Sequence, residues 1–510
     1  MRTVRFLQCF AWVGLFLSLS SVVAFAQPAT TLATGLQAPI KIRLTPVGNL
    51  LVAEGGTGPN TGRISLVSRT GVRRTLVDGL PSGINRDGAS PAPIGPTGLE
   101  YVADTLYVTI GSGDQSIPGP SQGTVIANPN ASSPILSSVL RLRLGSVDSS
   151  AGNFHLSPAQ HATIKTGGEA VLQNEQGETL RISLVVDFPD IVSIPGSDVA
   201  IFSSNPFGVV AFGSHIYVVD SNLNRIQNVD PVTGSFTTLT AFSQIINPLA
   251  PMGPTFIDAV PDSIRVSGGQ FLVPMLTGFP FPPGAAFVSR VDPSTGSPQT
   301  LISGRTTAID VLAPDTAPTK YFVLEFSTNM LAGAPGRLLF FDSATAAPTV
   351  VAAPLITPTN MALDPLTREI FVTEFGPGRI ARVSVASVLA AASCTSDATT
   401  LCLGGGRYQV RAAFRTPQGV TGNGVAVSLT GTTGYFWFFS PDNAEVFVKV
   451  LDGCPVNSRK WVFASGMTNV NVTLTVTDTV TGATRAYENP INTPFAPIQD
   501  TAAFTCPVVM

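Results

Sequence analysis

Hydrophobic and polar positions along this 510-residue chain alternate in short runs, and such runs predict β-strands. One unit recurs: an apolar strand opened by Pro or Thr, a short turn, a second strand rich in Val, Tyr and Phe, and a third strand. A unit of about 50 residues with about four strands is typical of a propeller blade. The six copies of the opening strand read APIKIRL, GPTGLEY, NPFGVVA, VPDSIRV, TTAIDVL and TPTNMAL. We therefore expect a six-bladed β-propeller over residues 27–390.

Two segments modify this repeat. TTLATGL, residues 30–36, precedes the first unit and is expected to supply the outer strand of the last blade, which closes the ring. The second unit carries an insertion at about 115–195 that includes His155 and His161. A seventh blade within it is the alternative, although the insertion lacks the Pro-led opening strand.

The pattern changes after the Ala- and Ser-rich stretch VASVLAAASC. About seven short alternating strands over residues 394–510 predict a small Ig-like β-sandwich. Trp437 and Trp461 are expected to anchor its core. Four cysteines lie in this part: Cys394, Cys402, Cys454 and Cys506. They predict two disulfides and allow three pairings, and a local Cys394–Cys402 bridge is favoured. A four-thiolate metal site is the alternative, but Cys-x7-Cys is not zinc spacing.

Composition and the N-terminus refine the class and the location. With 44% hydrophobic and 12% charged residues, 48 Gly and 42 Pro, the chain favours turn-connected strands and an all-β fold. Arg2 and Arg5, an apolar run and Ala24-Phe25-Ala26 form a secretory signal pattern at residues 1–26, with cleavage after about Ala26. An uncleaved anchor is the alternative, but the run is shorter than the roughly 20 residues of a spanning helix.

These features predict an exported protein that is periplasmic, secreted or attached to the cell surface. No later segment reads as a membrane span, and the chain has no basic run that would bind nucleic acid. We expect a monomer whose partner is a small molecule or an extracellular protein.

The stretch YVVDSNLNRIQNV raises the question of a calcium loop, because Asp220, Asn222 and Asn224 alternate. An EF-hand loop needs Gly at its sixth position and Glu at its twelfth, and here those are Arg225 and Pro231. Carboxylates at the same strand end recur as Glu54, Glu325 and Glu374. We therefore interpret all four as acceptors of free backbone N–H groups at turns.

Alternate residues of each opening strand should line the central channel. The charged residues and the one asparagine at these positions are the candidates for lining the channel: Lys41, Arg43, Glu100, Arg265, Asp310 and Asn360. The pairs Arg43 with Glu100 and Arg265 with Asp310 come from adjacent blades, so they either hold the ring in register as ion pairs or orient a small ligand. No cofactor is expected, although calcium at Glu100 and Asn360 stays open as a weak alternative.

TGFPFPPGAAF, residues 277–287, is the most ligand-like surface feature. Phe279 and Phe281 on a proline-stiffened loop can present aromatic rings at low entropic cost, or they can cap the core of their own blade. The three histidines, His155, His161 and His215, are expected to have surface or packing roles. GPSQG, residues 119–123, lacks the strand-to-helix turn of a nucleophile elbow.

Several stretches carry a resemblance to known proteins. YVVDSNLNRIQNVDP resembles an NHL-type propeller repeat, and LVAEGG, SNPFGVVAF, LTGFPFPPGAAFVSRVDP and YFVLEFS resemble the ScyD/ScyE family. The similarity covers roughly Thr30 to Val385, and the C-terminal module resembles one found on bacterial exported proteins. The family is linked to production of scytonemin, an indole-based pigment. The resemblance implies an exported propeller that handles a small, aromatic molecule.

Two functions follow as expectations. The first is an exported propeller that binds a small molecule or a protein partner. The alternative is an extracytoplasmic, lactonase- or lyase-like enzyme, with or without a metal, that acts on a secondary metabolite through the channel. Loss of activity on changing Glu100 or Asp310 would favour the enzyme.

Overall fold

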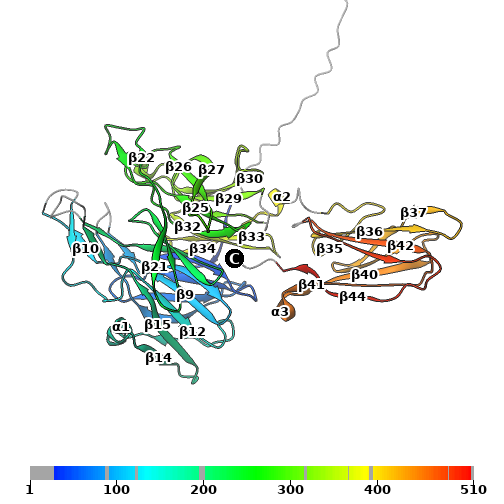
Figure 1. Cartoon of the computed structure of the whole chain (residues 1–510), viewed down its shortest axis with the longest axis horizontal. Coiled ribbons are helices and arrows are strands. Elements are labelled where there is room, and N and C mark those ends of the chain that lie inside the picture. The colour runs from blue at the N-terminus through cyan, green and yellow to red at the C-terminus, as the bar shows by residue number, and fades with distance from the viewer. Residues whose placement is uncertain are drawn as a thin grey trace, which may run out of the picture.

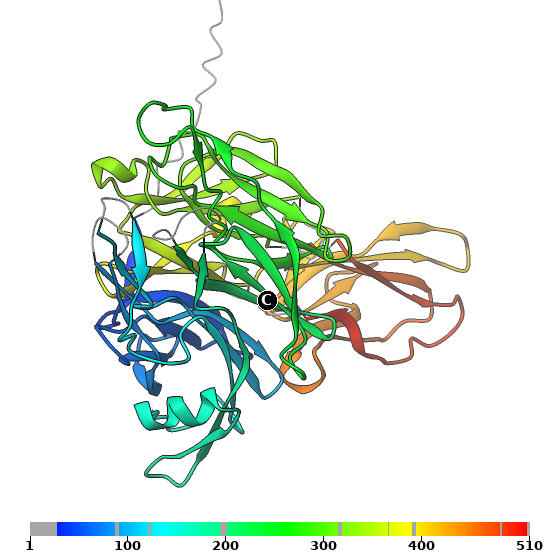
Figure 2. The same ribbon diagram turned by 60° about the vertical axis from the view of Figure 1, so that its left-hand side comes forward.

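The computed structural model describes residues 28–86, 91–120, 124–193, 201–314, 319–365, 367–389, 394–479 and 482–506. The predicted signal segment lies outside the described residues. Strands form almost all of the regular structure, so the predicted all-β class is confirmed. The chain folds into a propeller and a C-terminal sandwich that lies beside it (Figures 1 and 2).

In the described part of the propeller, six sheets, each with four antiparallel strands, follow one another along the chain. The first three are β2 (Pro39–Leu44), β3 (Leu50–Glu54), β4 (Gly62–Val67), β5 (Arg73–Leu80); β8 (Pro96–Val102), β9 (Thr105–Ile110), β12 (Ser138–Arg143), β15 (Thr179–Asp187); and β18 (Pro206–Phe212), β19 (His215–Asp220), β20 (Arg225–Val229), β21 (Phe236–Ala241). The others are β24 (Arg265–Ser267), β25 (Gln270–Met275), β26 (Ala286–Val291), β27 (Pro298–Arg305); β28 (Ala308–Leu312), β29 (Tyr321–Glu325), β30 (Gly336–Phe341), β31 (Thr349–Leu355); and β32 (Pro358–Asp364), β33 (Glu369–Glu374), β34 (Arg379–Ser384) with β1 (Thr30–Ala33).

The ring closes as the sequence predicts. β1 pairs antiparallel with β34, with Thr30 opposite Arg382, so the start of the propeller supplies the outer strand of its last sheet. The inner strands contact one another in a cycle, from β2 to β8, β18 and β24, then from β25, the second strand of the fourth sheet, to β28, β32 and back to β2. A closed ring leaves no sheet edge free at its junction.

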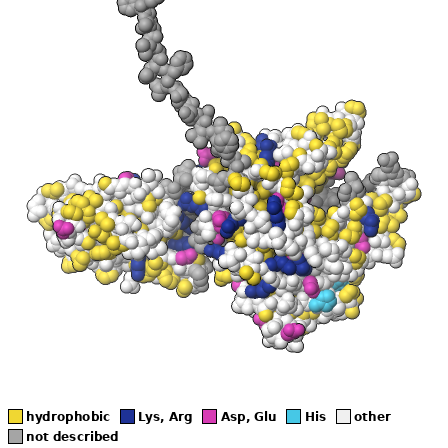
Figure 3. All heavy atoms as spheres, turned by 180° about the vertical axis from the view of Figure 1, so that it is seen from behind, with side chains coloured by type: hydrophobic (Ala, Val, Ile, Leu, Met, Phe, Trp, Pro, Cys, Tyr) yellow, Lys and Arg dark blue, Asp and Glu magenta, His cyan; other side chains and the backbone are white. Residues whose placement is uncertain are grey.

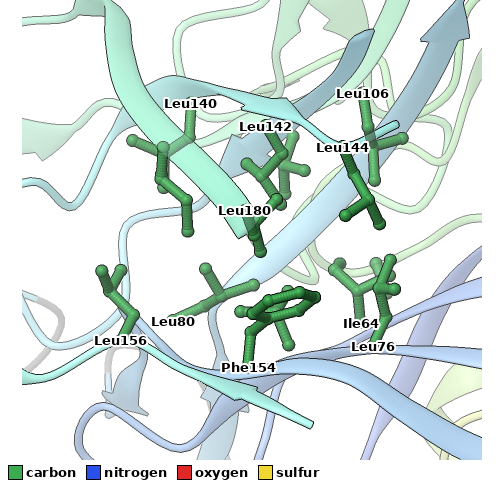
Figure 4. Packing of buried hydrophobic residues seen from close by; sticks show 14 of the residues in the cluster. Ile64, Leu76, Leu80, Leu106, Leu140, Leu142, Leu144, Phe154, Leu156 and Leu180 are labelled. Carbon is green, nitrogen blue, oxygen red and sulfur yellow. The ribbon is translucent and has the colours of Figure 1, made fainter. Parts of the chain in front are cut away.

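The insertion in the second unit extends existing sheets. β13 (Phe154–His155) pairs in parallel with β5, and β14 (Glu169–Gln173) pairs with β15, so the first two sheets each gain a fifth strand. Helix α1 (Pro158–Lys165) begins at a Ser157 capping box. Phe154 lies between leucines of the two sheets in the largest apolar cluster of the propeller (Figure 4). The described part of the insertion therefore forms no separate sheet of a seventh blade.

Short elements lie outside the main sheets. The hairpins β6 (Gly83–Asn85) with β7 (Ala92–Ile94), β16 (Ile191–Ser193) with β17 (Ile201–Ser203) and β22 (Ile245–Ile246) with β23 (Phe256–Ile257) lie on connections between sheets. The hairpin β10 (Ser116–Pro118) with β11 (Val125–Ala127) and the 3-10 helix η1 (Met330–Ala332) lie between the second and third strands of their sheets, and α2 (Ala386–Leu389) follows the last strand of the propeller. Among the residues that the structure describes, no helix combines the length and hydrophobicity needed to cross a membrane.

The C-terminal part consists of two five-stranded sheets around one apolar core. The first holds β35 (Leu401–Leu403), β36 (Tyr408–Arg415), β37 (Thr421–Asn423), β42 (Asn471–Asp478) and β43 (Thr484–Asn489); the second holds β38 (Val425–Thr430), β39 (Thr433–Trp437), β40 (Ala444–Gly453), β41 (Arg459–Gly466) and β44 (Ile498–Thr505), with α3 (Cys454–Asn457) between β40 and β41. Two disulfides, Cys394–Cys402 and Cys454–Cys506, confirm the predicted number and the favoured local bridge.

The expectation for the two tryptophans is wrong. The core is filled by Phe436, Val448, Val462 and their even-numbered neighbours on β39, β40 and β41. Strand side chains alternate between the two faces, so Trp437 and Trp461 project from the opposite, outward face and are only partly buried. The indole N–H of Trp461 donates to the Asn457 side chain at 2.9 Å.

Candidate functional site

The DSNLN stretch is a structural corner. The Asp220 carboxylate accepts the Asn205 backbone N–H at 2.9 Å and the Ser204 hydroxyl at 2.7 Å. Asn222 donates to the Ser203 carbonyl at 3.0 Å. Asn224 adopts a positive φ of 51°, which asparagine tolerates, and its side chain holds the connection that follows β21. The interpretation as turn-stabilising polar groups is confirmed.

The same device recurs in other sheets. The buried carboxylates of Glu54, Glu325 and Glu374 each accept a backbone N–H from the segment that precedes the first strand of their sheet. Each also pairs with an arginine at or near the start of the third strand: Glu54 with Arg63, Glu325 with Arg337 and Glu374 with Arg379. In the third sheet, Arg225 lies 3.4 Å from Asp220 in the same way. These arginine partners were not predicted from the sequence. The acids therefore join three strands of one sheet rather than forming a metal loop.

At the axis, five of the six predicted residues make buried polar contacts, and the sixth, Lys41, is buried beside them. Arg43 and Glu100 form a two-point ion pair at 2.8 Å. Arg265 binds Asp310 through Nε at 3.0 Å and through Nη2 at 2.5 Å. These side chains are at most 10% exposed, so the ion pairs join neighbouring sheets and fill the axis.

Asp310 is the centre of this network. It also accepts the Ser263 hydroxyl at 2.6 Å, the Asn360 amide at 2.7 Å and the Met361 backbone N–H at 2.9 Å. Burial alone would raise the pKa of Asp310, but Arg265, Lys41 and the hydrogen bonds outweigh it and lower the pKa. Asp310 therefore stays ionised and ties the fourth, fifth and sixth sheets together.

Two buried groups at the axis stay unpaired among the described residues. The Lys41 ammonium and Oδ2 of Asp262 have no hydrogen-bond partner, although both side chains are at most 5% exposed. Burial lowers the pKa of Lys41 to about 8, an effect that Asp310 opposes and that Arg265 and Arg43 reinforce. Burial raises the pKa of Asp262 well above its ordinary range, which Lys41 opposes. Lys41 belongs to the first sheet and Asp262 precedes the first strand of the fourth, so the two groups come from opposite sides of the ring.

The residues considered for calcium already have protein partners. Glu100 binds Arg43, and Oδ1 of Asn360 accepts the Ile42 backbone N–H at 3.2 Å. In the described part of the chain, Asp452 lies close to Cys454 and Cys506, but those cysteines form a disulfide and are not free to bind a metal ion. Calcium at the axis stays an untested prediction.

The histidines have the structural roles that the sequence suggests. His161 on α1 is fully buried, with its ring nitrogens 3.0 Å from the Ser133 hydroxyl and 2.9 Å from the Gly79 carbonyl. Burial lowers the pKa of His161, so it is held neutral between the insertion and the first sheet. His155 is a surface residue that contacts Asp78 at 2.7 Å.

The predicted ligand platform lies on one end of the propeller. Phe279 is 53% exposed and Phe281 is partly buried, with ring centroids 6.2 Å apart and planes perpendicular. Neither ring belongs to an apolar core cluster, so the exposed platform is favoured over a cap on the blade core. A tight turn from Gly278 to Phe281, closed by a 2.8 Å hydrogen bond, presents the rings.

The neighbouring connection between the third and fourth sheets extends this platform. Backbone hydrogen bonds of 2.9–3.0 Å join residues 276–278 to residues 258–260. The β22–β23 hairpin places Ile246 opposite Phe256, which are 71% and 53% exposed, and Met252 is 48% exposed near its tip. Gly253 packs against the Phe279 ring, where a Cβ would approach within 3.2 Å. We call residues 242–257 and 276–285 the apolar lip; neither range contains a charged residue.

Exposed hydrophobic side chains are unevenly distributed between the two ends of the ring. In an antiparallel sheet, the connections between sheets and those between the second and third strands lie at the same end. This loop face exposes Ile126, Phe202, Ile246, Met252, Phe256, Phe279, Leu331 and Ile356, while the turns and strand ends at the opposite end expose Val47, Val72, Val102, Val232 and Phe236. Figure 3 shows hydrophobic side chains gathered on the protrusion that carries β22.

Fold and site define an all-β protein built around a propeller with an apolar loop face. No family model matches the chain, and no curated protein matches it. Among solved structures, it is similar to Kuenenia stuttgartiensis hydrazine synthase, at 14% identity over 71% of this chain and 81% of that chain, with a TM-score of 0.37.

Two further structures have comparable similarity. One is the putative oxidoreductase (glucose dehydrogenase) from Thermus thermophilus, at 14% identity over 70% of this chain and 99% of that chain, with a TM-score of 0.37. The other is the PQQ-bound aldose sugar dehydrogenase from Streptomyces coelicolor, at 14% identity over 70% and 96%, with a TM-score of 0.36. Similarity at this level carries no argument about activity, and the ring follows from the chain's own strand pairing.

Proposed function

We propose that this protein is an exported, six-bladed, NHL-like propeller of the ScyD/ScyE type, with an Ig-like sandwich, that binds an uncharged, aromatic small molecule at the apolar lip. The observation that carries the proposal is the exposed, charge-free set of Phe279, Phe256, Ile246 and Met252 on one end of the ring. Sites for small molecules are mostly apolar and are enriched in aromatic side chains.

Rigidity supports binding at this position. Hydrogen bonds from residues 276–278 to residues 258–260 and from Asn224 to Val260 at 2.8 Å fix the base of the lip. A preformed surface loses little conformational entropy when a ligand binds. Export is supported by the signal pattern and by two disulfides, which persist in oxidising compartments. We propose a monomer, with a protein partner as the other occupant of the lip.

Binding of Nile red, an uncharged aromatic dye, tests this proposal. We expect saturable fluorescence enhancement with the mature protein and at least a tenfold weaker Kd in Phe279→Ser, because about 1.5 kcal/mol or more of aromatic contact is lost. Val232→Ser is the matched control: this valine is 87% exposed on the opposite end of the ring. Equal affinity for all three proteins would refute binding at the lip.

Chemistry at the axis is the second candidate, and one observation favours it. The ammonium of Lys41 is buried and unpaired among the described residues, and its lowered pKa leaves more of it as the neutral amine near pH 7, the form that acts as a base or nucleophile. The metal-assisted form of this candidate predicts one bound calcium ion per chain, which Glu100→Gln should lose. Plasma mass spectrometry measures the calcium content, and thermal melting before and after chelation measures its effect on stability. A metal-free protein whose melting is insensitive to chelator would refute that form.

A further inference from the structure

The outward face of the second sandwich sheet is lined by aromatic residues. On β39, β40 and β41 the even-numbered residues fill the core, so the odd-numbered residues project outward. Tyr435 lies opposite Phe447 with ring centroids 5.4 Å apart, and Trp461 lies 6.2 Å from Phe463. All four side chains are partly exposed. An outer sheet face that only meets water does not need four large rings.

A depression of about 260 Å³ crosses the same face. It spans β39, β40, β41 and the start of β44, and the outward side chains that line it are Thr433, Phe447, Lys449, Phe463, Ser465 and Gln499. Drug-sized ligands occupy pockets of about 300–1,000 Å³, so this volume suits a single ring or one unit of a longer chain. The lining combines aromatic surfaces with hydroxyl, amide and ammonium groups.

Lys449 gives the depression its charge. Its ammonium lies 5.1 Å from the centroid of the Phe463 ring, which holds the side chain over the aromatic face. Within the described part of the chain, the ion pairs found do not include Lys449. It is also the one charged residue among those that line the depression. A ligand with an anionic group would therefore find an accessible, prepositioned cation.

We propose that this face binds an acidic polysaccharide, with a uronic-acid ring in the depression. The C–H face of a pyranose stacks on aromatic rings, while its hydroxyl groups need partners such as Gln499, Ser465 and Thr433. Lys449 pairs with the carboxylate of the ring. A lipid surface or an apolar dye has no use for these polar groups, and a neutral sugar leaves the ammonium unpaired.

The open geometry suits an extended chain rather than an isolated ligand. The depression runs across four strands and is bordered by the Tyr435–Phe447 pair on β39 and β40. Neighbouring sugar units of a polymer can contact these rings in turn. The acidic polysaccharide is a polyanion, and Lys449 is the cation that it would contact. Salt screens these charges, so binding is expected to weaken as the salt concentration rises.

Titration calorimetry with polygalacturonate and with dextran, a neutral polymer, tests the proposal on the mature protein. We expect binding of polygalacturonate that weakens with salt, about tenfold weaker binding in Lys449→Gln, and loss of binding in Phe463→Ala. Met467→Ser is the control, because this residue is 72% exposed just beyond β41 and outside the lining.

Several results would overturn the proposal. No binding of polygalacturonate at millimolar sugar, equal binding of dextran, or unchanged affinity in both Lys449→Gln and Phe463→Ala would each do so. Thermal melting of every variant separates loss of a site from loss of the fold, and Lys449→Gln, a change of an exposed residue, keeps the test valid if Phe463→Ala unfolds. The Phe279→Ser variant should bind polygalacturonate normally, which distinguishes this site from the lip.

Discussion

Replacing Lys41 with methionine should stabilise the protein. The Lys41 ammonium is buried at the axis without a hydrogen-bond partner among the described residues, and its pKa falls from 10.5 to about 8. That displacement corresponds to about 3 kcal/mol of unfavourable environment for the charged form. Methionine has a similar length and no charge, so Lys41→Met should raise the free energy of unfolding at pH 7 by about 1–3 kcal/mol.

The pH dependence gives a sharper test. Between pH 8 and 10.5 the unfolded chain keeps a proton on Lys41 that the folded protein releases, so the contribution of this residue to stability rises with pH across that window. Urea unfolding of the wild-type protein and Lys41→Met at pH 7, 8, 9 and 10 measures the difference. The two curves should converge as the pH rises. A variant that is less stable at pH 7, with a constant difference up to pH 10, would refute the reasoning and show that Lys41 forms a favourable contact.

Three other changes test the structural account. Glu325→Gln should lower the free energy of unfolding in urea by about 3 kcal/mol, because it breaks a buried carboxylate–arginine pair. Glu169→Gln, in an exposed pair, should lower it by at most about 1 kcal/mol. Equal losses in the two variants would contradict the assigned burial. Replacing Cys454 and Cys506 with serine opens a bridge that spans 52 residues, so the free energy of unfolding of the sandwich should fall by about 4 kcal/mol. A thermal transition that does not change would contradict the pairing. His161 has a lowered pKa, so its contribution to the free energy of unfolding is complete above pH 6.5 and is lost as the pH falls through the pKa of the folded state. His161→Gln should therefore flatten the acid side of the plot of stability against pH. An unaltered plot would show that His161 does not cause the loss of stability in acid.

The sequence was informative where side-chain period and strand order determine position. Alternate residues of the opening strands converge on the axis, which is why the strand pattern alone pairs Arg43 with Glu100 and Arg265 with Asp310. Asp262 was missed because it lies between an isolated bridge at Pro261 and the start of β24, where the regular alternation is broken. Position in a repeat does not specify such local departures.

The remaining gaps have similar physical causes. The arginine partners of the strand-end acids do carry a sequence signal, since an Arg at the third strand recurs in each case, as at Arg63 and Arg379. The run YFWFF, which begins on β39 and continues past its end, is aromatic on both faces, so composition cannot tell which rings enter the core. Packing against the facing sheet decides it, and there Phe436 is buried while Trp437 is not.

Hydrogen–deuterium exchange of the mature protein with and without Nile red tests the binding account most directly, because it locates the ligand without assuming a residue. Slower exchange is predicted in peptides that cover residues 242–260 and 276–285, with the first strands of the sheets and the sandwich unchanged. Protection confined to the axis strands β2 and β28, or to residues 433–499 of the sandwich, would contradict a ligand site at the apolar lip.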